Sequence, residues 1–463
     1  MLKKMKVIAL LLSVVMCATM FAGCGTPTEE EREIIITIGN WPTRAGRPTD
    51  FELYEQYKKD FMEKYPNIGI RTDEWAWTPD TFLPRAEAGT LPNMYRVTYT
   101  EPGKIIRSGY ALDITDYLVE HKYDQYLNPA ALNIVTRDGR YYGIPHTGYM
   151  VGMTYNVAII REAGLVDEND NPIYPETYEE LIEWGKIIRE NTGHAAFGLP
   201  TQGGWGGWQF MQIAWAFGVN FMEEQADGSW LATFNTPEAI AAFEYYRDLR
   251  WKHNLLPEHI VLIDRDELSE ILYTGRLAAI YGGAGEVPPR VFEYGIKIED
   301  MGWGPVPAGP AGRYAQFGGD IYMFSQQTTP EQLEACIKWI NFIGLGPEMD
   351  ENLEERFTER LMSQQASGYG LQFAGAAYDV WNNPERDVLK PIQDRFANVV
   401  KEQVRPMLDE TVTLRPEEPL YAQELYVALS DIMQAILLDE NADIPALLER
   451  ANNNFQSDFL DRI

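Results

Sequence analysis

The chain has 463 residues, 45% of them hydrophobic, which is enough for two or three domains with buried cores. Its formal net charge at pH 7 is −30, and so acidic a protein repels phosphate backbones. We therefore expect no nucleic-acid partner.

Residues 1–23 have the features of a secretory leader. Lysines precede an apolar stretch at 7–22, which is shorter than the roughly 20 residues that a permanent membrane helix needs. The sequence AGC at 22–24 resembles a bacterial lipobox, in which the cysteine is lipidated and becomes the first mature residue, although Phe21 stands where Leu is usual. We therefore expect a protein tethered by a lipid on Cys24 to the extracellular face of the cell membrane. The alternatives are an ordinary signal with a chance cysteine, or an uncleaved anchor.

The other cysteines exclude an internal disulfide. Cys17 leaves with the leader and Cys24 carries the lipid, so Cys336 remains alone. It falls among Leu333, Ile337 and Ile340, which recur at helical spacing, and this predicts a small buried hydrophobe.

The mature chain begins with a polar segment, 24–32, that we predict to be a flexible tether. A dense β-branched run at 34–38 then predicts a buried strand. A helix follows, capped by Thr49 and stopped by Pro66, and a second strand is expected at 67–71. Strand, helix and strand at this spacing predict a βαβ unit.

Three later helices are marked by their start signals. Thr177 opens a capping-box pattern, Thr236 precedes a proline at the first helical position, and Thr329 combines both signals. Strands alternating with such helices predict an α/β chain.

Several short segments, in this order, resemble the family-1 extracellular solute-binding proteins, which are the sugar-binding lipoproteins of ABC importers. They are KYPNI at 64–68, AGTLPN at 88–93, GYALDITDYL at 109–118, YGIP at 142–145 before YN at 155–156, AGL at 163–165 with PETYEEL at 175–181, YTGRLAA at 273–279, and GGD at 318–320. Asn93 departs from the pattern, because the family commonly has Asp there.

The resemblance implies an α/β fold of the two-lobe periplasmic-binding-protein type (type II), with a hinge and a ligand cleft between the lobes. We expect one lobe from 33–148 with 312–365 and the other from 149–311 with 366–463. It also implies an ABC permease as partner and a monomeric protein that needs no cofactor.

A sugar offers hydroxyl groups and apolar C–H faces, so its site needs aromatic platforms and a few fixed polar groups. Aromatic residues at strand ends, in glycine-rich segments or in late loops meet that need: Trp41, Trp75, Trp77, Trp205, Trp208, Tyr281 and Trp381. Polar candidates near expected strand ends are Glu101, His146, Glu286 and Asp320, and Arg44 is a candidate partner for a ligand carboxylate. For each of these residues, a structural role within a lobe is the alternative.

No metalloprotease, phosphate-loop or nucleophile-elbow motif occurs. The acidic loop at 167–172 lacks the glycine of a calcium loop, so no metal site is predicted. The sequence therefore favours a non-enzymatic receptor that closes its lobes on a carbohydrate, with an oligosaccharide expected. Two alternatives stay open: a surface glycoside hydrolase or lyase that uses cleft carboxylates, and a binding protein for a non-sugar solute.

Overall fold

The computed structural model describes residues 32–283, 294–376, 378–409 and 412–462. The predicted leader, Cys24 and Glu286 lie outside these residues. Within them, no helix has both the length and the apolar character that a membrane span requires.

The chain divides into two compact units, each described by itself. The first unit contains the residues up to Tyr95 together with 327–343, and the second contains 96–326 and 344–463. The bounds of these two units differ from those of the predicted lobes. The limits of the lobes therefore stay a prediction.

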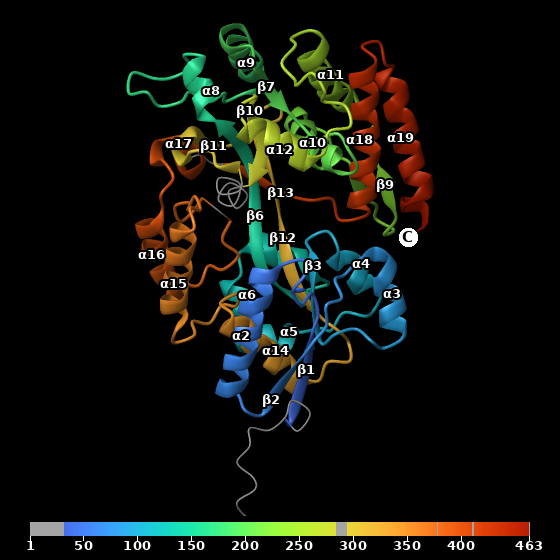
Figure 1. Cartoon of the computed structure of the whole chain (residues 1–463). Coiled ribbons are helices and arrows are strands. Elements are labelled where there is room, and N and C mark those ends of the chain that lie inside the picture. Colours follow the sequence, from blue (N-terminus) through green and yellow to red (C-terminus); the bar gives the residue numbers. More distant parts are fainter. Residues whose placement is uncertain (1–31, 284–293, 377, 410–411, 463) are drawn as a thin grey trace, which may run out of the picture. The chain divides into compact units, whose positions relative to one another are not determined.

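The described part of the first unit is a small α/β assembly. Its elements are β1 (Ile34–Ile38), α2 (Pro48–Lys64), β2 (Ile68–Thr72), α3 (Pro79–Glu87), β3 (Met94–Thr98, whose last residues belong to the second unit) and α14 (Pro330–Phe342) (Figure 1).

Strands β1 and β2 pair in parallel with Ile36 opposite Ile70, which confirms the predicted βαβ unit. Helix α2 begins at Pro48, one residue before the predicted cap Thr49, because a proline fits the first helical turn without losing a hydrogen bond. The core is aromatic: Trp339 stacks on Trp41. Cys336 is fully buried, as predicted.

The second unit holds most of the chain. The helices in its described part are α4 (Pro102–Arg107), α5 (Thr115–Glu120), α6 (Tyr123–Tyr126), α7 (Pro129–Ile134), α8 (Val157–Glu162), α9 (Tyr178–Thr192), α10 (Trp205–Phe217), α11 (Pro237–Trp251), α12 (Arg265–Tyr273), α15 (Leu353–Ala366), α16 (Leu389–Phe396), α17 (Lys401–Asp409), α18 (Ala422–Leu438) and α19 (Ile444–Asp458). Its further strands are β4 (Thr136–Arg137), β5 (Arg140–Tyr141), β6 (Gly143–Asn156), β7 (Ala195–Gly198), β8 (Met222–Glu224), β9 (Trp230–Ala232), β10 (Leu277–Gly283), β11 (Met301–Gly304), β12 (Tyr314–Phe324) and β13 (Thr413–Pro416).

The long strand β6 organises the second unit. Its first half pairs antiparallel with β12, and its second half pairs antiparallel with β10 and β11. The β6–β12 register shifts at one point, since Thr147 faces Asp320 while Pro145 faces Ile321. His146 is the extra residue of this irregularity, which has the form of a β-bulge.

Each of the three threonines predicted to begin a helix is the N-cap of that helix in the structure. The side chains of Thr177, Thr236 and Thr329 each accept a hydrogen bond from a backbone N–H in the first turn of α9, α11 and α14. At α14 the capping box is complete, because Gln332 also bonds back to the backbone of Thr329. Helix α18 packs against both α10 and α19, and α18 and α19 lie side by side (Figure 1).

Candidate functional site

A pocket of about 560 Å³ lies within the second unit. Its volume falls in the usual range for a small-molecule site. The lining residues come from the end of β3, the middle of β6 and β12, the first turns of α10 and α12, and the start of α18: Thr98, Thr147, Gly148, Tyr149, Val151, Gly204, Trp205, Trp208, Arg265, Gly319, Asp320, Glu417, Gln423 and Tyr426.

The predicted platforms Trp205 and Trp208 both line this pocket, but on a helix rather than in a loop. They occupy the first turn of α10, which begins at Trp205. The side chain of Trp205 is 43% exposed, and its ring meets that of Trp208 edge-on at 5.7 Å. Two indole rings at a right angle can contact two faces of one ligand.

The glycines around these tryptophans serve helix packing. A Cβ on Gly207 would overlap the backbone carbonyl of Tyr426 in α18. The Gly207 N–H also donates to Ser430 Oγ at 2.8 Å. The absence of a side chain therefore lets α10 approach α18, which brings Trp208 and Tyr426 to the same pocket wall.

Glu417 joins three aromatic side chains at that wall. Its Oε1 accepts hydrogen bonds from the Tyr149 hydroxyl at 2.7 Å and the Trp208 indole at 3.1 Å, and its Oε2 accepts from the Tyr426 hydroxyl at 2.8 Å. Hydrogen bonds to a carboxylate are roughly twice as strong as neutral ones, so this group fixes the orientation of the rings.

A second acidic residue follows Glu417 but turns away from solvent. Glu418 is buried, and burial raises its pKa to about 7 against the lowering influence of Arg415, whose guanidinium lies 3.6 Å away. Glu417 and Glu418 thus belong to two different environments.

Asp320 is the third predicted site residue that the pocket contains. Its Oδ2 lies 3.5 Å from the Arg96 guanidinium and accepts a hydrogen bond from Thr147 Oγ1 at 3.4 Å. Burial raises the pKa of Asp320, while Arg96 lowers it. The pocket is also lined by a cation, because the Arg265 guanidinium stacks over the Trp205 ring with its carbon 4.4 Å from the ring centroid.

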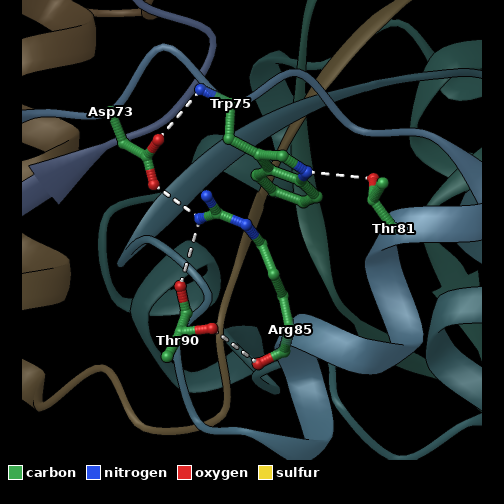
Figure 2. A network of polar contacts seen from close by, with 5 residues as sticks. All are labelled: Asp73, Trp75, Thr81, Arg85 and Thr90. Atoms are coloured by element: carbon green, nitrogen blue, oxygen red, sulfur yellow. Dashed lines mark hydrogen bonds and ion pairs between the residues drawn. The ribbon is translucent and has the colours of Figure 1, made fainter.

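Trp75 and Trp77 follow β2 in the first unit and are half-buried. Figure 2 shows Trp75 in a polar network: its indole donates to Thr81 at 3.0 Å, and Arg85 lies against its ring while bonding Asp73 at 2.7 Å. The ring is therefore held in place by side chains of its own unit.

Trp41 and Arg44, the other candidates in the first unit, differ in exposure. Trp41 is 3% exposed and donates its indole hydrogen to Glu55 at 3.0 Å. Arg44 is exposed, pairs with Glu52 at 3.0 Å and lies over the Phe51 ring. The structure assigns a local partner to each of them, and their ligand roles stay predictions.

Four further candidates are buried in the second unit. The hydroxyl groups of Tyr281 and Tyr178 are hydrogen-bonded, and the Trp381 indole donates to the Leu345 carbonyl at 3.0 Å. His146 stacks on Tyr322 at 4.0 Å, and burial together with Arg96 lowers its pKa to about 3. Glu101 is 2% exposed and accepts from Thr100 rather than lining the pocket.

Several lining residues went unnoticed in the sequence, above all Glu417, Tyr149, Tyr426, Arg265 and Thr98. Glu417 lies between β13 and α18, more than 200 residues from its partners Tyr149 and Trp208. No group of His, Cys, Asp or Glu side chains in the described ranges could hold a metal ion.

A comparison with known proteins identifies the protein family that this chain matches. The family described as "Bacterial extracellular solute-binding protein" matches residues 45–344. The chain is also similar to an arabinooligosaccharide-binding protein of Halalkalibacterium halodurans, with 26% identity over 74% of this chain and 72% of that protein. A maltotriose-binding protein of Pyrococcus abyssi is 21% identical, and the match spans about half of each chain, 56% of this one and 52% of that one.

A solved structure, maltose-bound MalE3 of T. maritima, has the same fold. It superposes with a TM-score of 0.63 at 20% identity, covering 92% of this chain and 99% of the other. Neighbours of this kind have the type II periplasmic-binding-protein fold, so the predicted two-lobe α/β fold class is confirmed.

Proposed function

Because this chain belongs to the bacterial extracellular solute-binding protein family, we propose that it is the receptor of an ABC importer and captures an oligosaccharide. The observation that carries this proposal is the pair of perpendicular indole rings, Trp205 and Trp208, beside the carboxylates of Asp320 and Glu417 in one pocket.

The chemistry of that pocket fits a sugar. The apolar C–H face of a pyranose or furanose can stack on Trp205, while ring hydroxyls can reach carboxylate and phenol oxygens. The names of two relatives point the same way, since they bind arabino-oligosaccharide and maltotriose. The family consists of binding proteins, which favours capture over turnover.

The remaining features of the proposal come from the sequence. A lipid on Cys24 would hold a monomeric receptor at the extracellular face of the cell membrane, next to its permease. Lobes formed by 33–148 with 312–365 and by 149–311 with 366–463 would close on the sugar, so that ligand shifts the population toward the closed state. Mass spectrometry of the membrane-extracted protein tests the anchor: a diacylglyceryl group on Cys24 is expected, and an unmodified N-terminus at another residue would contradict it.

A panel of purified oligosaccharides tests the function. We expect stoichiometric binding in calorimetry and no new product by chromatography after prolonged incubation. Catalytic turnover would instead indicate a hydrolase or lyase. Stabilisation by non-sugar solutes alone in a thermal-shift screen would indicate a different ligand class.

A further inference from the structure

The hydrogen bonds behind the pocket wall fix which way its hydroxyl groups point. Thr98 lines the pocket, and its Oγ1 lies 2.9 Å from Thr100 Oγ1. Thr100 in turn donates to Glu101 Oε1 at 2.9 Å. These three residues form a chain that leads from the pocket to a buried carboxylate.

The direction of this chain follows from hydrogen counting. An ionised carboxylate can only accept, and a hydroxyl has one hydrogen. Thr100 donates its one hydrogen to Glu101, so the hydrogen in the bond between the two threonines must come from Thr98. Thr98 then offers only lone pairs to the pocket. Burial raises the pKa of Glu101, while Lys104, whose Nζ lies 3.9 Å from Glu101 Oε2, and the hydrogen bond from Thr100 lower it. A proton on Oε2 would still leave Oε1 as the acceptor for Thr100.

Glu417 has the same effect on the aromatic side of the pocket. The hydrogens of the Tyr149 and Tyr426 hydroxyls are directed to its two oxygens. The Trp208 indole hydrogen is shared between Glu417 Oε1 at 3.1 Å and the side-chain oxygen of Gln316 at 3.0 Å. The two phenol oxygens are left with lone pairs, and the Asp320 carboxylate adds further acceptors. At Asp320, the hydrogen of Thr147 is also directed to the carboxylate, at 3.4 Å.

We propose that Glu101 and Glu417 are positioning residues that make this wall a hydrogen-bond acceptor, so that the pocket selects ligands that donate. The inference rests on the proposed function and narrows it: the captured saccharide is neutral or amine-bearing, and a uronic acid is rejected. A carboxylate placed at the wall would meet oxygen lone pairs and the negative charges of Asp320 and Glu417. Arg265, the cation among the lining residues, is stacked on the ring of Trp205.

Saccharides of matched length and linkage that differ in charge test the selectivity. The probes are α-1,4-galactotriose with α-1,4-trigalacturonate, triacetylchitotriose with chitotriose, and the neutral trisaccharides of glucose, xylose and arabinose. We expect a neutral or amine-bearing probe to bind at least about tenfold more tightly than trigalacturonate, since like charges in an interface are strongly disfavoured. Trigalacturonate binding as tightly as the best neutral probe would overturn the inference and leave the proposed function intact.

Glu417→Gln tests the acceptor wall, because it removes one negative charge and changes the hydrogen-bond direction at the wall together. The amide brings hydrogens of its own, which releases a phenol hydrogen toward the pocket. We expect trigalacturonate to gain affinity relative to the neutral probe in this variant, whereas Glu449→Gln, an exposed change on α19, should leave the ratio unchanged. An unchanged ratio in Glu417→Gln would contradict the positioning role.

Neutron diffraction on deuterium-exchanged crystals provides a readout that needs no ligand. We expect the deuterium of Thr98 to point to Thr100 and those of Tyr149 and Tyr426 to point to Glu417. A deuterium of Thr98 or of either phenol directed into the cavity would overturn the inference. If no saccharide of the panel binds, the proposed function fails, and this measurement alone then decides whether the wall is an acceptor.

Discussion

The indole nitrogen of Trp208 donates to Glu417 Oε1 at 3.1 Å, which ties an aromatic platform to the acidic wall of the same pocket. The two residues come from α10 and from the segment before α18, and the close approach of these helices at Gly207 is what brings them together. Stacking surface and hydrogen-bond acceptors are therefore one rigid unit rather than independent contacts.

Trp205→Ala should weaken saccharide binding and leave the fold intact. The ring is 43% exposed, so its loss removes stacking area from the ligand and little packing from the core. We expect an affinity loss of about 1–3 kcal/mol in calorimetry. Trp251→Ala is the matched control, because Trp251 is similarly exposed at 38% but lies outside the pocket on α11. Equal losses in both variants would remove Trp205 from the site.

Gly207→Ala should destabilise the protein. The added methyl group would overlap the Tyr426 backbone and push α10 away from α18, and overpacking of this kind costs about 1–3 kcal/mol. Gly204→Ala is the comparison, since its Cβ would meet the nearest atom, Tyr426 Cβ, at an ordinary 3.4 Å. Urea unfolding of both variants measures the difference. Equal stability of the two would mean that the helices do not depend on the Gly207 contact.

Asn93→Asp should destabilise the first unit, although the family commonly has Asp there. Asn93 Oδ1 accepts from the Thr37 N–H at 2.7 Å, while its Nδ2 donates to Gln332 at 3.2 Å and to Thr328 at 3.4 Å. An aspartate keeps the first bond and turns an oxygen toward two acceptors. We expect a loss of about 1–3 kcal/mol in the free energy of unfolding at neutral pH. A variant as stable as the parent would show that the amide hydrogens contribute nothing.

His146 should make the protein sensitive to acid. Its pKa is lowered to about 3, below the ordinary 6.5, so between these values the unfolded chain binds a proton that the folded chain does not. Stability from this residue is present above pH 6.5 and is lost as the pH falls toward 3, by roughly 4–5 kcal/mol in total. His146→Phe should flatten the pH profile of unfolding over this interval, whereas the exposed His259→Phe should not. Parallel profiles for His146→Phe and the parent would refute the assignment.

Local patterns in the sequence predicted the elements whose formation depends on neighbours along the chain. The β-branched run at 34–38 is β1, and the threonine caps begin α9, α11 and α14. No helix is predicted at 205–208, because Gly206 and Gly207 have low helix propensity, yet α10 begins at Trp205. Packing of α10 against α18 outweighs that cost, which no local pattern reveals.

The candidate site was predictable only in part for the same reason. Trp205 and Trp208 are candidates because of the glycines around them and Asp320 because of its place at an expected strand, and all three line the pocket. Trp41 has a similar local setting but is covered by Trp339, which lies nearly 300 residues further along the chain. Glu417 was missed because its role is defined by Tyr149 and Trp208, which are distant in sequence. Contacts that close across the fold therefore decide how far each aromatic ring is exposed.

A crystal structure of the protein with the tightest-binding trisaccharide tests the central claim most directly. We predict a sugar ring stacked on Trp205 or Trp208, with its hydroxyl groups donating to the oxygens of Asp320, Thr98 or the two phenols. A saccharide bound elsewhere, with this pocket holding only solvent, would contradict the account.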